Sequence, residues 1–307
     1  MREASAVDTK LRIPFVLIQH IRLRLDAARE KFDGMSSVET EEREALDAAA
    51  GGGAKRAYVR QIFSEIAPSY DLLNHLLSMN IDRGWRARAI EALRWDRRPR
   101  GTYLDVCAGT LDVSAQLARE EGFSGRVIAA DFAEPMLLRG AAKTRGLPVD
   151  AVVADALQLP LPSGSADGAI VAFGARNFDA LDAGLRELGR VLAPGARLVI
   201  LDFCTPPSML VRQGYHLYFH RVLPLVGRLV SGHRTAYRYL PASVANFPAA
   251  GELARMLERA GFEGVGFRTL TMGIAALHWG ERATGDAAAS RVRPGAASAA
   301  TPGARGA

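Results

Sequence analysis

Short apolar runs of strand length, alternating with stretches of helical periodicity, constrain the fold of this chain more than any other feature. Five such runs lie at Thr102–Val106, Arg126–Asp131, Asp150–Ala154, Gly168–Phe173 and Arg197–Asp202. Helical patterns lie between them at Val113–Glu121, Glu134–Arg145 and Leu181–Leu192. Because strands that alternate with helices pair in parallel, the pattern predicts an α/β fold with helices on both faces of the sheet.

The segments on either side of this region extend the predicted fold. Tyr58–Ile66 and Asp82–Leu93 have the spacing of amphipathic helices that precede the first strand. Val265–Leu270 and Ile274–Trp279 have the pattern of two further strands, separated by a turn at Gly273. We therefore expect a Rossmann-like, mostly parallel sheet of seven strands.

Composition divides the 307 residues into three parts. We expect residues 1–54 to be a partly disordered N-terminal extension that ends in a small-residue linker, Ala48–Ala54. Residues 55–280 form one globular domain, and residues 281–307, rich in Ala, Gly, Ser and Pro, form a disordered tail. The net charge of +6 lies wholly within residues 51–280. Such a basic excess is compatible with binding to nucleic acid, to a membrane surface or to an anionic ligand, and it does not distinguish among them.

Several classes of protein are excluded. With 49% hydrophobic and 23% charged residues, the chain has the composition of a soluble globular enzyme. It has no run near the ~18 apolar residues of a spanning helix. Its two cysteines, Cys107 and Cys204, cannot build a disulfide framework or a four-cysteine zinc site, and we expect both to be small buried residues. No cluster of His, Asp and Glu has metal-ligand spacing, so no metal is expected.

Polar residues gather where the predicted strands end. The first strand leads into a loop with Asp105 and Gly109, where a small residue lets the backbone approach a ligand beside a helix N-terminus. Asp131 ends the second strand and suits the two hydroxyls of a ribose. Asp155 follows the third strand, where it could accept a hydrogen bond from an adenine amino group. The alternative is that these aspartates only cap helices.

The choice of nucleotide-containing cofactor depends on this loop. A dinucleotide needs G-x-G-x-x-G to seat its pyrophosphate, and Gly109 is the one glycine between Asp105 and Asp112. S-adenosylmethionine has no phosphate, so a looser loop is sufficient. The sequence therefore favours methyl transfer over NAD-dependent chemistry.

Longer motifs carry a family resemblance. They include Phe63–Ser78, Phe173–Asn177 and Tyr237–Pro241, and the similarity extends from Phe63 to Gly280. These segments resemble the class I quinone C-methyltransferases of ubiquinone and menaquinone biosynthesis, which include demethylmenaquinone methyltransferases. The resemblance implies that residues 55–280 are an S-adenosylmethionine-dependent methyltransferase domain.

Carried over by position, the resemblance implies that Thr110, Asp131, Asp155 and Ala156 bind the cofactor. A fourth contact position, commonly serine in the family, is Ala172 here. A loop position that is usually glycine is Leu111, which either crowds the methionine end of the cofactor or marks a rerouted loop.

The acceptor chemistry requires a quinol carbon in line with the methyl group, a matter of positioning and exclusion of water. We predict that Arg176 stabilises a developing phenolate, with Asn177 and Tyr237 as further catalytic residues. The alternative for Arg176 is a structural ion pair with Asp179 or Asp182. The predicted substrate-binding residues are Tyr70, Asn74, Arg176, Tyr237 and Tyr239; the two last-named tyrosines would alternatively only pack. His75 and His233 are weak candidates for a general base.

The segment 210–247 mixes apolar and aromatic residues with arginines, as expected of a substrate cover that faces an anionic bilayer. It would alternatively be an ordinary pair of amphipathic helices. We expect a cytoplasmic protein that associates peripherally with membranes, takes a prenylated quinol as substrate, binds no nucleic acid, and forms a homodimer or joins a complex of quinone-synthesis enzymes. The competing functions are a small-molecule O- or N-methyltransferase, an RNA methyltransferase that uses the basic charge, and a cofactor-binding protein without turnover.

Overall fold

The computed structural model describes residues 43–48, 53–70, 80–217 and 236–284. The chain divides into two compact units, Met1–Glu44 and Ala45–Ala307. All the helices and strands named below lie in the second unit.

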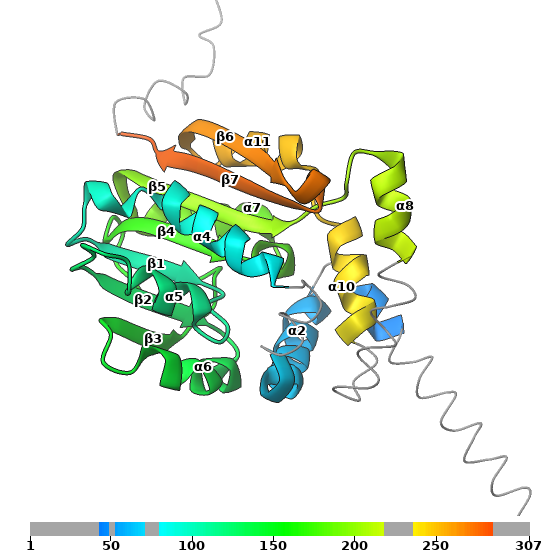
Figure 1. The fold of residues 1–307 in the computed structure, drawn as a ribbon, viewed down its shortest axis with the longest axis horizontal. Helices are drawn as coiled ribbons and strands as arrows, with labels where there is room; N and C mark the ends of the chain where they lie inside the picture. Colours follow the sequence, from blue (N-terminus) through cyan, green and yellow to red (C-terminus); the bar gives the residue numbers. More distant parts are fainter. Residues whose placement is uncertain (1–42, 49–52, 71–79, 218–235, 285–307) are drawn as a thin grey trace, which may run out of the picture. The chain divides into compact units, whose positions relative to one another are not determined.

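A single sheet of seven strands organises this unit, in the order β3-β2-β1-β4-β5-β7-β6 (Figure 1). Its strands are β1 (Thr102–Val106), β2 (Arg126–Asp131), β3 (Val149–Val153), β4 (Ala166–Ala172), β5 (Leu192–Phe203), β6 (Phe262–Leu270) and β7 (Ala275–Arg282). The first five pair in parallel, and β7 runs antiparallel to both β5 and β6. The predicted mostly parallel, seven-stranded sheet is confirmed.

Helices cover both faces of the sheet because strand side chains alternate between its two sides. On β1, Tyr103 packs in one hydrophobic cluster and Leu104 in the other. The first face is covered by α4 (Ile81–Leu93), α5 (Asp112–Leu117) and α6 (Glu134–Gly140), and the second by α7 (Leu181–Val191) and α11 (Ala250–Arg259).

Helices α2 (Gly53–Ile66), α8 (Met209–Leu217) and α10 (Ala236–Ala245) lie outside these layers. The described residues also form short 3-10 turns: η1 (Ala67–Ser69), η2 (Trp95–Arg97), η3 (Ala141–Thr144), η4 (Ala175–Asn177) and η6 (Thr271–Gly273). The buried side chains of Val59 and Ile62 on α2 pack with Tyr239 of α10, so these two helices share a small core of their own. None of the described helices is long and apolar enough to cross a membrane.

Several predicted boundaries shift. The helix predicted over Glu134–Arg145 ends at Gly140 and continues as η3, and α6 packs so closely on the β1 loop that Gly140 has no room for a side chain. A Cβ on Gly140 would lie 2.4 Å from the carbonyl oxygen of Thr110. The fifth strand begins at Leu192, which pairs with Ala166, rather than at Arg197.

The predicted domain edges also change. Ala48, placed in the linker by its composition, is buried beside Val59 and Ile62, and α2 begins at Gly53. At the other end, β7 continues to Arg282, so the first two residues of the predicted tail belong to the sheet. The rest of the predicted extension and tail, residues 1–42, 49–52 and 285–307, lies outside the described residues.

Candidate functional site

The carboxyl ends of the parallel strands form the edge at which ligands bind in sheets of this type. In the strand order, β1 lies between β2 and β4, so connections leave it in both directions and open a crevice there. A cavity lies at this edge, between the ends of β2, β3 and β4. Its lining includes Cys107, Asp131, Phe132, Asp155, Ala156 and Asn177.

Asp131 is held in the cavity wall by the backbone. Its Oδ2 accepts a hydrogen bond from the amide of Gly109, and its Oδ1 accepts one from Ala133, each at 2.9 Å. Burial raises the pKa of Asp131, and the hydrogen bonds from backbone amides oppose that shift. A carboxylate has about four acceptor positions, so Asp131 retains capacity for the hydroxyls of a ligand.

Asp155 lies just beyond β3 on a loop. Its Oδ1 accepts a hydrogen bond from the amide of Leu157 at 2.9 Å. Its Oδ2 forms an ion pair with Arg56 of α2 at 2.6 Å. The structure therefore places a cation from α2 on the carboxylate that sequence analysis assigned to adenine.

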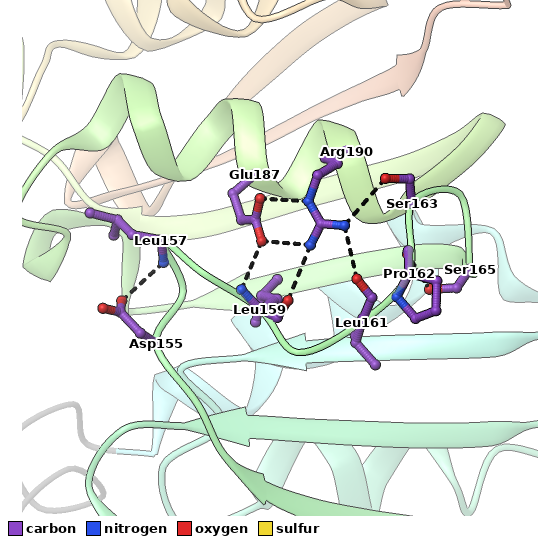
Figure 2. Close-up of polar contacts among 9 residues, drawn as sticks. All are labelled: Asp155, Leu157, Leu159, Leu161, Pro162, Ser163, Ser165, Glu187 and Arg190. Carbon is purple, nitrogen blue, oxygen red and sulfur yellow. Dashed lines mark hydrogen bonds and ion pairs between the residues drawn. The ribbon is translucent and has the colours of Figure 1, made fainter.

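Two residues of α7 anchor the loop that carries Asp155 and Ala156 (Figure 2). Glu187 accepts a hydrogen bond from the amide of Leu159 at 2.7 Å, and Arg190 pairs with Glu187 at the same distance. Arg190 also donates to the carbonyls of Leu159 and Leu161, at 3.1 and 2.8 Å. This bonding holds the loop that follows the cavity residues Ala154–Leu157, without using Asp155 itself.

The β1 loop, which connects β1 to α5, contributes Cys107 to the cavity lining. Asp105 is almost completely buried and accepts a 2.6 Å hydrogen bond from the hydroxyl of Ser114. Burial raises the pKa of Asp105 to about 7, against the effect of the Ser114 hydrogen bonds. Gly109 adopts a positive φ of 53°, and a Cβ there would lie 3.4 Å from Met136. Glycine adopts this backbone conformation without strain.

The structure separates the predicted cofactor residues into two groups. Asp131, Asp155 and Ala156 line the cavity, whereas Asp105, Gly109, Thr110 and Ala172 are not among its lining residues. The buried Thr110 receives a 3.1 Å hydrogen bond from Lys143. Ala172 ends β4 and packs against the apolar cluster beneath α4.

Leu111 is accommodated without entering the cavity. It adopts the left-handed conformation usual for glycine, with φ 64°, and its side chain packs in a buried cluster with Ala129 and Leu137. The loop therefore keeps a glycine-like turn, and Leu111 is not among the residues that line the cavity.

These features fit the adenosyl half of S-adenosylmethionine. Asp131 suits the ribose hydroxyls, and Asp155 suits the amino group of adenine. Phe132, Ala156 and Leu157 provide apolar surface for the ring. Burial also raises the pKa of the Cys107 thiol well above its usual value, so this lining residue stays a neutral thiol.

Comparison with known families identifies the chain. The ubiE/COQ5 methyltransferase family matches residues 52–282. The chain belongs to this family. It is 49% identical over 223 residues to the demethylmenaquinone methyltransferase of Thermus thermophilus, which covers 72% of this chain and 100% of that protein. It is 41% identical over 228 residues to the ubiquinone/menaquinone biosynthesis C-methyltransferase UbiE of Geobacter sulfurreducens, covering 73% and 88%.

Solved structures agree on the fold of this ubiE/COQ5 family member. An S-adenosylmethionine-dependent methyltransferase of Thermotoga maritima superimposes with a TM-score of 0.53 and 17% identity, over 72% of this chain and 98% of that one. The [4+2]-cyclase SpnF superimposes with a TM-score of 0.56 and 18% identity, over 74% and 97%. Family and fold together make the protein a class I methyltransferase with S-adenosylmethionine as its cofactor.

A second cluster of polar residues in this methyltransferase surrounds Arg176. The Arg176 guanidinium donates to Asp202 Oδ1 at 2.8 Å and to the carbonyl of Phe173, and the Arg176 amide donates to Asp202 Oδ2 at 3.1 Å. Burial acts to lower the pKa of Arg176. The negative charge of Asp202 and its hydrogen bond act in the opposite direction, and the pKa of Arg176 is raised overall. Arg176 therefore does form the ion pair that was the alternative to a catalytic role, but its partner is Asp202 and not Asp179 or Asp182.

Asn177 and Tyr239 extend the cluster. The Tyr239 hydroxyl donates to Asn177 Oδ1 at 3.1 Å, and its ring centroid lies 5.7 Å from that of Tyr58. Burial raises the pKa of Tyr239, which keeps the hydroxyl protonated. Tyr70 packs with Phe63, their ring centroids 5.9 Å apart. The side chain of Tyr237, and Asn74, His75 and His233 entirely, lie outside the described residues.

Two residues of this site were missed by sequence reasoning. Asp202 is the last residue but one of the apolar strand β5, at the same edge as Asp131, so the pattern that identified Asp131 was available for it as well. Lys55 is buried and donates from Nζ to the carbonyl of Arg176 at 2.9 Å. Nothing in its local sequence distinguishes it from the exposed cations that follow it on α2.

Proposed function

We propose that this methyltransferase methylates a ring carbon of a prenylated quinol, with demethylmenaquinol as the favoured acceptor and a ubiquinone precursor as the second candidate. The observation that carries the proposal is the 49% identity to a demethylmenaquinone methyltransferase that is matched over its whole length. The buried cation at the end of β4 supports it, because a reduced quinone becomes nucleophilic at carbon when a hydroxyl carries negative charge.

In this proposal, one set of residues binds the cofactor and another set binds the quinol. Asp131, Asp155 and Ala156 would hold the adenosyl group, with Asp105, Gly109, Thr110 and Ala172 behind them. The cofactor, when bound, supplies an electrophilic methyl group on a sulfonium. In the reaction, the new carbon–carbon bond forms as the carbon–sulfur bond breaks, and the ring then loses a proton.

Arg176 would stabilise negative charge on the quinol oxygen. Its guanidinium is buried, and electrostatic stabilisation is strongest where water is excluded. Asn177 and Tyr239, linked by their hydrogen bond, would position the ring together with Tyr70, Asn74 and Tyr237. Asp202 keeps Arg176 charged and oriented, so it acts through Arg176 rather than on the substrate.

Helix α8 supports a peripheral encounter with membranes. Its side chains Met209, Leu210 and Leu217 are exposed, and Arg212 lies among them in the sequence. Exposed apolar residues with nearby arginine suit the interface of an anionic bilayer, where a prenylated quinol resides. A cytoplasmic location, and assembly as a homodimer or with other quinone-synthesis enzymes, remain predictions.

The test is methylation of demethylmenaquinone in detergent micelles, with the quinone either oxidised or reduced by dithionite, and product detected by mass spectrometry. We expect methyl incorporation only into the reduced form, and a parallel assay with a demethylated benzoquinol ranks the two acceptors. Cofactor binding in calorimetry without incorporation into either quinol would refute the proposal and favour a binding protein without turnover. Salt-dependent RNA methylation would favour the RNA alternative.

A further inference from the structure

Helix α2 brings two consecutive cations to the site, and the chemistry proposed above uses neither. Arg56 reaches the cofactor side, where it pairs with Asp155 while its side chain stays 63% exposed. Lys55 reaches the acceptor side, where it is only 8% exposed and contacts the carbonyl of Arg176. The two residues thus contact two different loops of the same edge.

A buried lysine carries a cost that an apolar residue would avoid. Its ammonium loses hydration, and its long side chain loses rotamer freedom. The other buried positions of α2, such as Val59 and Ile62, are apolar and pack well. Packing alone therefore does not account for an ammonium at position 55.

The charges around Lys55 come from η4, from the loop that follows it and from β5. Burial lowers the pKa of Lys55, Arg176 lowers it further, and Asp179 and Asp202 oppose these effects, with Asp179 the strongest attractive charge. One carboxylate oxygen of Asp179 is buried and has no hydrogen-bond partner within the described part of the chain. Lys55 and Arg176 therefore place two cations at the end of β4, next to a carboxylate that lines the cofactor cavity.

The hydrogen bond from Lys55 also completes the fixation of Arg176. Asp202 binds the amide and the guanidinium of Arg176 from β5. Lys55 binds the carbonyl of the same residue from α2. Arg176 is thereby held at its amide, carbonyl and side chain by two elements that are far apart in sequence.

We propose that Lys55 is a positioning residue for methyl transfer, whose bond to the Arg176 carbonyl holds η4 so that the Arg176 guanidinium meets the developing oxyanion of the acceptor. This inference rests on the proposed role of Arg176. It adds that α2, which lies outside the sheet and its covering helices, is part of the acceptor site.

The experiment compares Lys55→Met, which keeps length and removes the donor, with Lys55→Arg, which keeps a cationic donor. Arg60→Met is the control, because Arg60 is an exposed cation on the same helix. For each variant, kcat and KM for the reduced quinone are measured, together with the Kd of S-adenosylmethionine by calorimetry. Hydrogen exchange of residues 173–179 in the protein without added ligands provides a readout independent of activity.

We expect Lys55→Met to lower kcat by about 10- to 100-fold, the usual effect of misplacing a catalytic group, with the Kd of S-adenosylmethionine unchanged within about two-fold. Exchange at Arg176 and Asn177 should become faster. Lys55→Arg should recover part of both losses, and Arg60→Met should behave as the parent protein. If Lys55→Met does not fold, Lys55→Leu, which also lacks a donor, replaces it in the same comparison.

An unchanged kcat, or unchanged exchange over residues 173–179, would overturn the inference. A loss of cofactor affinity equal to the loss of kcat would also overturn it, because Lys55 would then act on the cofactor side. If the parent protein methylates no quinol, the proposed function fails by itself, and the exchange comparison still decides whether Lys55 holds η4.

Discussion

Replacing Asp202 with alanine should destabilise the folded protein by about 3–5 kcal/mol, because it leaves the Arg176 guanidinium buried without its counter-charge. Both partners are nearly inaccessible, with side chains 7% and 2% exposed for Arg176 and Asp202. Asp202 also accepts hydrogen bonds from the amides of Arg176 and Phe203, at 3.1 and 2.8 Å. The substitution therefore removes the acceptor of three donors together.

The opposite substitution is less severe. Arg176→Met leaves the Asp202 carboxylate buried, but its two backbone donors remain, and a hydrogen bond to a charged group contributes about 1.5–3 kcal/mol. We expect a loss of about 2–3 kcal/mol for this variant, near the lower limit for a broken buried pair. The double variant, Arg176→Met with Asp202→Ala, leaves no unpaired charge. It should be more stable than the sum of the single losses predicts, by at least about 2 kcal/mol.

Urea unfolding at neutral pH, followed by circular dichroism, measures all three free energies of unfolding. Glu252→Ala is the control, because Glu252 pairs with Arg255 and Arg259 on the exposed side of α11 and its loss should change stability little. Additive single losses, or a loss for Asp202→Ala no larger than that of the control, would show that the pair is not coupled as the geometry requires.

Two further predictions concern the β1 loop. Because burial raises the pKa of Asp105 from 3.8 to about 7, the native protein keeps a proton that the unfolded chain releases. As the pH rises from about 4 to about 7, the contribution of Asp105 to the free energy of unfolding should therefore fall by up to about 4 kcal/mol. Asp105→Asn, compared with the parent in urea titrations from pH 4 to 8, should gain relative stability across this window; a constant difference would refute the prediction. Leu111→Ala should lose about 2–5 kcal/mol of unfolding free energy from its cavity, and Leu111→Gly should lose less, because glycine adopts the positive φ freely. A glycine variant less stable than the alanine variant would contradict this.

The sheet was predictable because its signal is local. Each predicted strand forms, and the largest boundary error, at β5, arises where Leu192 pairs with Ala166 at the start of β4. That pairing depends on where two distant strands meet, which periodicity does not report. The close approach of Gly140 to the β1 loop is likewise a tertiary contact that periodicity does not report.

The residues of the candidate site also differ in whether local sequence could identify them. Asp131 and Asp155 could be found because one ends β2 and the other lies just beyond β3, and the carboxyl ends of parallel strands share an edge. The partner of Arg176 could not be chosen from sequence, because proximity along the chain favoured Asp179 and Asp182 over Asp202, which is 26 residues away. Lys55 is 121 residues from the carbonyl that it binds, and only tertiary packing brings the two together.

The sheet of this protein does not by itself specify which reaction is catalysed. SpnF, a [4+2]-cyclase, superimposes on this chain with a TM-score of 0.56, so the sheet alone does not determine the reaction. In the described part of this chain, the carboxylates proposed to bind the cofactor, Asp131 and Asp155, lie at or just beyond strand ends, whereas Lys55 and Tyr239 come from α2 and α10, outside the sheet. Both helices converge on η4, through the contacts of Lys55 with Arg176 and of Tyr239 with Asn177. Substitutions at the strand ends should therefore change cofactor affinity first, and substitutions of Lys55 and Tyr239 should change turnover of the acceptor first.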